Sequence, residues 1–316
     1  MRSLLLYCSY MNWFFIALGA PFLWALVNIA DNYLVGRFSD KEKERSSGGL
    51  VLFSSLIGIF VSFFIWVFMP DVFNIPLLDK LLLFTCGVLT IVWIVLYLFT
   101  LEIEETSAVV PWFLSVPVFG YILGYFFLDE TLTFIQLVGS GVVFLGLILI
   151  SLDFSEGKKR IKHKPMLYML SASIAIAVSG AIFKYVTVGE NFWASSFWEY
   201  VGLGVSGLII FLFIPHYREA FLHMNRTGGR LIFTVNIVSE LFSILGNLLS
   251  NFALLLAPLS MVYLVGSFQP AIVLLLTILG TKFIPHIIKE DISHIVLLPK
   301  ILAILIITIG SILLFI

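Results

Sequence analysis

Ten apolar stretches, each long enough to cross a bilayer, follow one another through almost the whole of the 316-residue chain. A helix needs about 20 mainly apolar residues to span the hydrocarbon core of a membrane. Charged residues make up only 12% of the chain, whereas about 25% is usual in soluble proteins. We therefore predict an all-α integral membrane protein with ten transmembrane helices, in the stretches 12–35, 47–69, 77–101, 106–128, 132–153, 166–188, 192–214, 229–256, 258–281 and 293–316.

The two halves of the chain share landmarks at a constant spacing. Asp31 aligns with Lys184 and Pro117 aligns with Pro270, in both cases 153 residues later. We therefore predict two five-helix repeats, at 12–153 and 165–316, joined by a basic linker at 154–164. Because each repeat has an odd number of spans, the second enters the membrane in the opposite sense to the first. Inverted repeats of this kind place a transport site near the middle of the membrane, between the halves.

Lys and Arg residues are concentrated in the loops that follow odd-numbered spans. These loops hold 15 of the 18 basic residues, and the positive-inside rule assigns such loops to the cytoplasm. By this count both ends of the chain lie outside the cytoplasm. Whether the first residue is Met1 or Met11 stays open.

The stretch at 229–256 carries a polar stripe on one face of its predicted helix. An ionised carboxylate in mid-membrane costs roughly 2.5–3.5 kcal/mol, so Glu240 should face protein, water or a partner. We interpret the stripe as the wall of a cavity in which Glu240 binds substrate or a proton; hydrogen bonding between helices is the alternative. Its members are spaced four, three, four and four residues apart: Asn236, Glu240, Ser243, Asn247 and Asn251.

The first span presents Trp24, Asn28 and Asp31 at helical spacing, and the repeat partner of Asp31 is Lys184. We expect these residues to form part of the substrate site. Asp31 and Lys184 would make a buried pair or contact opposite ends of a zwitterionic substrate. The alternative is that both, lying close to helix ends, extend to the membrane interface.

Further candidates lie in the third, fourth, seventh and ninth predicted spans. Glu199 lies inside the seventh, beside tryptophans that fit either an interfacial belt or a ligand surface. Pro117 and Pro270 should kink their helices and are candidate gating positions. Glu130 is expected to cap or orient the helix that starts near Thr131. The other candidates for lining the cavity, with packing or lipid anchoring as the alternative, are Trp93, Tyr97, Tyr263, Ser267 and Gln269.

Residues 96–151 read LYLFTLEIEETSAVVPWFLSVPVFGYILGYFFLDETLTFIQLVGSGVVFLGLILIS. This segment resembles the EamA domain of the drug/metabolite transporter superfamily. The matching features are Thr106, Ser107, Ala108, Pro117, Glu130, Gln136, Gly139 and Gly146. The second half is similar, through Pro258, Ser260, Pro270 and Gly310.

The resemblance covers essentially the whole chain and implies two EamA-like repeats, with both ends in the cytoplasm, against the charge count. It also implies a transporter that exports amino acids, other metabolites or drug-like compounds. The second half departs from the pattern at one place: Lys282 and Phe283 stand where an acidic residue is expected, and residues 284–291 are inserted after them.

Several other function classes find no support in the sequence. Gly202-Leu-Gly-Val-Ser-Gly207 matches a dinucleotide-binding pattern, but inside an apolar span it indicates close helix packing. There is no P-loop or paired histidine motif, so we predict no enzyme activity, no cofactor and no metal. The expected partners are a small-molecule substrate, the lipid bilayer and, for coupling, protons, with no nucleic acid; monomer and homodimer stay open.

The sequence thus predicts a multi-pass secondary transporter that exports a small organic metabolite by alternating access, driven by protons or by exchange. A lipid or nucleotide-sugar carrier and a scaffold subunit without transport activity are the alternatives. The expected location is the bacterial plasma membrane.

Overall fold

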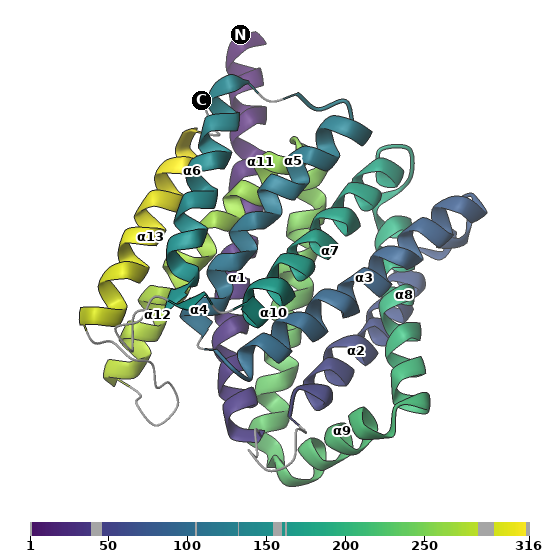
Figure 1. Ribbon diagram of the computed structural model, residues 1–316. Coiled ribbons are helices and arrows are strands. Elements are labelled where there is room, and N and C mark those ends of the chain that lie inside the picture. Colours follow the sequence, from purple (N-terminus) through teal and green to yellow (C-terminus); the bar gives the residue numbers. More distant parts are fainter. Residues whose placement is uncertain are drawn as a thin grey trace.

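The computed structural model describes residues 2–38, 46–104, 106–131, 133–153, 160–161, 163–283 and 294–313. Nearly all of the described chain is helical (Figure 1). The exception within these ranges is a pair of two-residue antiparallel strands, β1 (Leu152–Asp153) and β2 (Arg160–Ile161). The predicted all-α class is therefore confirmed.

The helices follow the predicted spans closely. Before the linker they are α1 (Arg2–Phe38), α2 (Ser46–Phe68), η1 (Pro70–Phe73), α3 (Leu77–Leu101), α4 (Thr106–Val109), η2 (Val110–Ser115), α5 (Val116–Phe127) and α6 (Phe134–Ser151). After it they are α7 (His163–Thr187), α8 (Phe192–Phe213), α9 (Pro215–Thr227), α10 (Gly229–Leu254), α11 (Leu259–Val265), η3 (Gly266–Phe268), α12 (Gln269–Phe283) and α13 (His294–Leu313).

Eight stretches of the described chain are long and apolar enough to cross a membrane, and α13 adds a shorter apolar helix at Leu297–Gly310. The protein is therefore a multi-pass integral membrane protein. Figure 1 shows the two ends of the chain on one side of the bundle, with α9 on the other.

One helix was not predicted. Residues 215–227 were interpreted as a connection, but they form α9, which packs against α2. Pro215 suits the first turn of a helix because the missing N–H would have no partner there. Ala220 and Met224 give the helix a buried side, although its other side chains are mostly polar. A short amphipathic helix of this kind does not stand out in a search for apolar runs.

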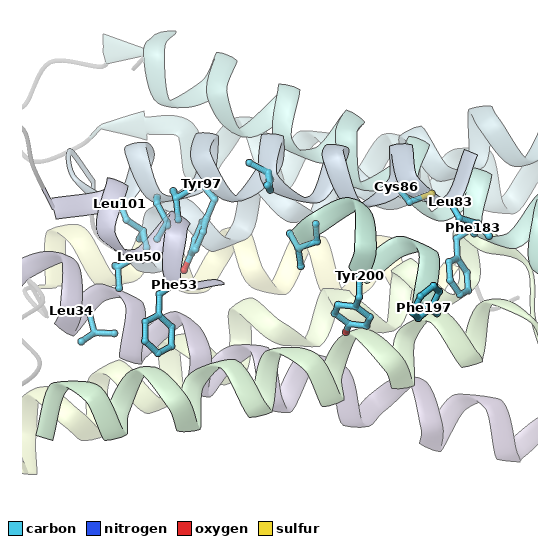
Figure 2. Close-up of a cluster of buried hydrophobic side chains, with 14 of the residues drawn as sticks. Leu34, Leu50, Phe53, Leu83, Cys86, Tyr97, Leu101, Phe183, Phe197 and Tyr200 are labelled. Carbon is cyan, nitrogen blue, oxygen red and sulfur yellow. The ribbon is translucent and has the colours of Figure 1, made fainter. Parts of the chain in front are cut away.

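The main contacts join helices before the linker to helices after it. α3 packs on α7 and α8, α1 packs on α10, α2 on α8, and α6 on α13. The largest apolar cluster follows α3, and Figure 2 shows Leu83 and Cys86 on this helix with Phe183 and Phe197 from its neighbours. The core therefore holds the two halves of the chain together.

Glycines let α3 and α8 approach until their backbones touch. A Cβ atom on Gly87 would overlap the carbonyl oxygen of Glu199, and one on Gly202 would overlap the carbonyl oxygen of Phe84. No side chain fits at either position without moving a helix. The prediction that the glycines at 202–207 serve close packing is confirmed.

Two helices are interrupted by 3-10 segments in the middle of the bundle. η2 separates α4 from α5, and η3 separates α11 from α12. Pro117 is the second residue of α5, and Pro270 is the second residue of α12. A proline in the first turn of a helix breaks no hydrogen bond, so each one marks where a new helix starts. Both prolines therefore lie where a 3-10 segment gives way to a new α-helical segment, and the kinks themselves stay a prediction.

Candidate functional site

A central cavity lies between the helices of the two halves. It has two adjoining lobes of about 140 and 80 Å³. Both lobes are lined by Trp24 and Asp31 of α1, Trp93 and Tyr97 of α3, and Asn247 of α10. Such a volume holds several water molecules or part of a small organic ligand.

Nine of the twelve residues predicted to bind substrate line one lobe or the other: Trp24, Asn28, Asp31, Trp93, Tyr97, Glu240, Asn247, Tyr263 and Gln269. They come from five helices, α1, α3, α10, α11 and α12. The structure therefore brings together polar residues that are up to 245 positions apart in the sequence, from Trp24 to Gln269. Their binding role stays a prediction.

A chain of hydrogen bonds crosses the larger lobe from α12 to α3. Gln269 Nε2 donates to Asn28 Oδ1 at 2.7 Å, and Asn28 Nδ2 donates to the Tyr97 hydroxyl oxygen at 2.7 Å. The Tyr97 hydroxyl in turn lies next to the Asp31 carboxylate. Because Gln269 follows the linker and the other members precede it, this chain connects the two halves. It also holds the Asp31 carboxylate in a defined place at the wall of the cavity.

Three carboxylates line the two lobes, and the polar groups described next to them are neutral. Glu199 Oε2 accepts from Asn251 Nδ2 at 2.8 Å, and Glu240 accepts from the hydroxyl of Ser54 on α2. Asp31 lies next to the Tyr97 hydroxyl, as described above. Among the described residues that line either lobe, none is Lys, Arg or His. The cavity is therefore an acidic, desolvated site without a basic counterpart from the protein wall.

Lys184 does not meet Asp31, so that part of the prediction is corrected. Its Nζ lies 2.6 Å from Glu130 Oε1 and donates to the carbonyl oxygen of Ala257 at 2.7 Å. Glu130 Oε2 also accepts from the backbone N–H of Leu259, at 2.9 Å. We call this arrangement the Glu130–Lys184 clasp. It joins the end of α5 to α7 and the start of α11, and Lys184 is not among the residues lining the cavity.

Glu130 was expected to cap the helix near Thr131, and this too is wrong. Its carboxylate caps α11, as shown by the bond from Leu259. The start of α6 is closed by its own residues: Thr133 N donates to Gln136 Oε1, and Gln136 N donates to Thr133 Oγ1. This is a reciprocal capping box, and it leaves Glu130 free to bond across the bundle.

Asn236 lies away from the cavity. Its amide donates to the carbonyl oxygen of Ile232 at 3.1 Å and lies 4.0 Å from the sulfur of Met224 on α9. The polar stripe of α10 therefore divides: Glu240, Asn247 and Asn251 face the cavity, whereas its first member packs inside the protein. The side chain of Ser267 lies outside the described residues.

Sequence reasoning missed some residues of the cavity. Ser54, which binds Glu240, and Tyr200, which lines the smaller lobe, carried no signal because one hydroxyl in an apolar span is common. Glu199 did carry a signal, since a charged residue inside a span points to a functional site. Because the tryptophans beside it also fit the membrane interface, the sequence alone did not assign Glu199 to the cavity.

Comparison with known proteins finds a family match in the first part of the chain. Residues 11–152 match the sequence model of the EamA-like transporter family. This segment is an EamA domain. The resemblance to the drug/metabolite transporter superfamily is thereby confirmed for these residues, and the match points to a transporter.

The fold match extends further than the EamA domain. The crystal structure of another protein has 13% sequence identity and a TM-score of 0.52, over 93% of this chain and 95% of its own. It is one of 22 solved chains that match. At this identity the likeness concerns the fold alone. A search of curated protein sequences finds no match.

The EamA domain supplies one wall of the cavity, and the chain after it supplies the other. Trp24, Asp31, Trp93 and Tyr97 lie within the matched segment, whereas α7, α8, α10, α11 and α12 follow it. The polar site therefore lies between the EamA domain and the second half of the protein.

Proposed function

We propose that this protein is a secondary transporter that moves a small organic molecule across the membrane by alternating access. The observation that carries the proposal is the central cavity, which is lined by polar side chains from both halves of the chain. In transporters built from two repeats, the substrate site lies at this kind of interface and the halves move around it. We further propose export as the direction and the bacterial plasma membrane as the location.

The pattern of helix contacts supports two inverted five-helix repeats, 12–153 and 165–316. If the halves are exchanged, the contact of α3 with α7 becomes that of α10 with α1, and the contacts of α2 with α8 and of α6 with α13 map onto themselves. The two interrupted helices also correspond under this exchange, because Pro117 and Pro270 each start the helix after the break. The breaks are the proposed gating points.

The Glu130–Lys184 clasp is the proposed closure at one end of the pathway. It ties α5, which precedes the linker, to α7 and α11, which follow it. A transporter must break such cross-connections when the halves rock apart. The clasp is one ion pair with hydrogen bonds to the backbone of Ala257 and Leu259, so few interactions have to be broken and formed again there, in contrast to a wide apolar interface.

The alternative functions, a nucleotide-sugar carrier and a scaffold subunit, would each require a different cavity wall. A nucleotide sugar carries a diphosphate, and phosphates are bound by Arg, Lys or backbone amides; the described lining offers three carboxylates and no basic side chain. A scaffold subunit would have no need of an acidic cavity in its core. Transport of a small metabolite or drug-like compound is therefore the function we favour.

The test is transport by purified protein in proteoliposomes, with Glu240→Gln as the main variant. We expect radiolabelled metabolite pools to be taken up by the wild type, and Glu240→Gln to lose most of this uptake while still eluting as a folded protein. Glu190→Gln, at a turn away from both lobes, is the matched control and should transport normally. Absence of uptake for every pool by well-folded wild type would refute the proposal.

A further inference from the structure

The charge balance of the cavity is unusual for a buried site. Asp31 and Glu240 line the same lobe and interact electrostatically, and Glu199 lies at the adjoining lobe. Their described polar neighbours are Tyr97, Ser54 and amide groups, all of them neutral. Because an uncompensated carboxylate in a desolvated interior is costly, the site calls for positive charge that the wall does not provide.

A second observation points to a missing ligand at the same place. The hydroxyl of Tyr200 is buried, with the side chain 3% exposed, and it lines the lobe that holds Asp31 and Glu240. It lies near Asn247 but makes no hydrogen bond of ordinary distance and angle within the described chain. Buried polar groups almost always have a partner, so the hydroxyl has capacity for a group that enters the cavity.

Aromatic rings form the rest of the wall. Trp24, Trp93 and Tyr97 line both lobes, and Phe113 and Tyr263 line the larger one. Trp93 packs against Tyr97 and Phe113, with ring centroids 6.3 and 6.1 Å apart, so these rings hold one another in place. Tryptophan and tyrosine faces attract organic cations, and the attraction is strongest where water is excluded.

We propose that the cavity binds a small organic cation, an amine or quaternary ammonium group on an aromatic or apolar body. The cationic group lies between Asp31 and Glu240, within reach of the Tyr200 hydroxyl, and the body occupies the larger lobe between the aromatic rings. This inference deepens the proposed function, because it names the substrate class of the transport site. An amino acid is a poorer fit, since its own carboxylate would add a further negative charge.

The experiment compares three probes of one shape that differ in charge: phenethylamine, 2-phenylethanol and 3-phenylpropionate. Binding to the detergent-purified full chain is measured by calorimetry at neutral pH, with quenching of tryptophan fluorescence as a second readout. We expect phenethylamine to bind at least about tenfold more tightly than the alcohol, as one charge-assisted contact would give. We expect no binding of the propionate.

Isosteric variants test the two carboxylates one at a time. Asp31→Asn and Glu240→Gln should each weaken phenethylamine binding by about tenfold or more, and Tyr200→Phe by about three- to tenfold. Glu190→Gln should bind like the wild type. If Asp31→Asn does not fold, Asp31→Glu keeps the charge, should fold and should retain amine binding. Equal binding of the amine and the alcohol, or full amine binding by both Asp31→Asn and Glu240→Gln, would overturn the inference.

Binding and flux separate this inference from the proposed function. Carboxylate-dependent binding of the amine, without flux of any compound in proteoliposomes, would support the cation site and refute the transporter. Flux of a neutral or anionic compound that does not depend on Asp31 or Glu240 would support the transporter and refute the cation site.

Discussion

Two of the contacts that join the halves of this protein are built differently. Where α3 meets α8, glycines bring backbone against backbone, and a Cβ on Gly87 or Gly202 would overlap a carbonyl oxygen of the facing helix. Where α1 meets α10, by contrast, a glycine faces a side chain: a Cβ on Gly246 would lie 2.7 Å from Nε1 of the Trp24 ring. Main-chain atoms therefore make the first contact, whereas a side-chain ring that can rotate makes the second, at the edge of the cavity.

This difference shows which part of the bundle can change shape. Backbones in contact cannot separate slightly without losing many dispersion contacts at once. A contact made through a tryptophan ring and hydrogen-bonded amides can be rearranged, because the ring has other rotamers and the amides can bond to water or ligand. We therefore expect the contact of α3 with α8 to act as a fixed framework about which the two halves pivot, and α1 and α10 to carry the substrate-dependent movement.

The largest expected effect comes from breaking the fixed contact. Gly87→Ala places a methyl group against the backbone of α8, and neither helix can yield without disturbing the apolar cluster around α3. Overpacking of this kind lowers the free energy of unfolding by about 3 kcal/mol. Thermal unfolding of the purified protein, followed by size-exclusion chromatography after heating, measures the loss. An unchanged melting temperature would show that the two backbones do not touch.

Breaking the Glu130–Lys184 clasp should cause the second-largest loss of stability. Lys184→Met leaves the Glu130 carboxylate with the Leu259 amide as its described partner, at a cost of roughly 2 kcal/mol for a pair that is largely buried. The double variant Lys184→Met with Glu130→Gln should lose less than the sum of the two single variants, since the charge left behind is gone. Additive losses in the melting experiment would argue against direct pairing.

Substitution of Gly246, the glycine beside the cavity, should cost less stability than substitution of Gly87. Gly246→Ala pushes on the Trp24 ring, which can rotate, so we expect a loss of about 1 kcal/mol or less in the free energy of unfolding. Ligand binding should change much more than stability, because Trp24 lines both lobes. Calorimetry with phenethylamine and a melting curve on the same sample make the comparison with Gly87→Ala. If both variants lose the same stability, the contrast between the two contacts is wrong.

The sequence predicts those features of the fold and of the cavity that depend on local interactions, and not those that depend on how the two halves dock. Apolar runs and prolines act locally, so the spans and the breaks at Pro117 and Pro270 could be derived from the sequence. Nine cavity residues could be named because a polar group within a span must face away from lipid. Lys184 was misassigned because its partner depends on how two halves dock, and two positions aligned by a repeat need not meet. The partners of Glu130 and Asn236 are set by the same docking.

The smallest expected change in stability is at Glu240, where the functional effect should be large. The carboxylate is a buried acid whose described hydrogen bond comes from Ser54, and no basic residue lines its lobe in the described chain. Glu240→Gln keeps the shape and can still accept from Ser54 while removing a charge that is costly to bury, so the free energy of unfolding should stay equal or rise by up to about 1 kcal/mol. A melting temperature at or above that of the wild type, together with lost binding of the amine, would mark a residue kept for function at the expense of stability. A large fall in melting temperature would instead mean that the charge stabilises the bundle, and that α10 belongs to the fixed framework with α3 and α8.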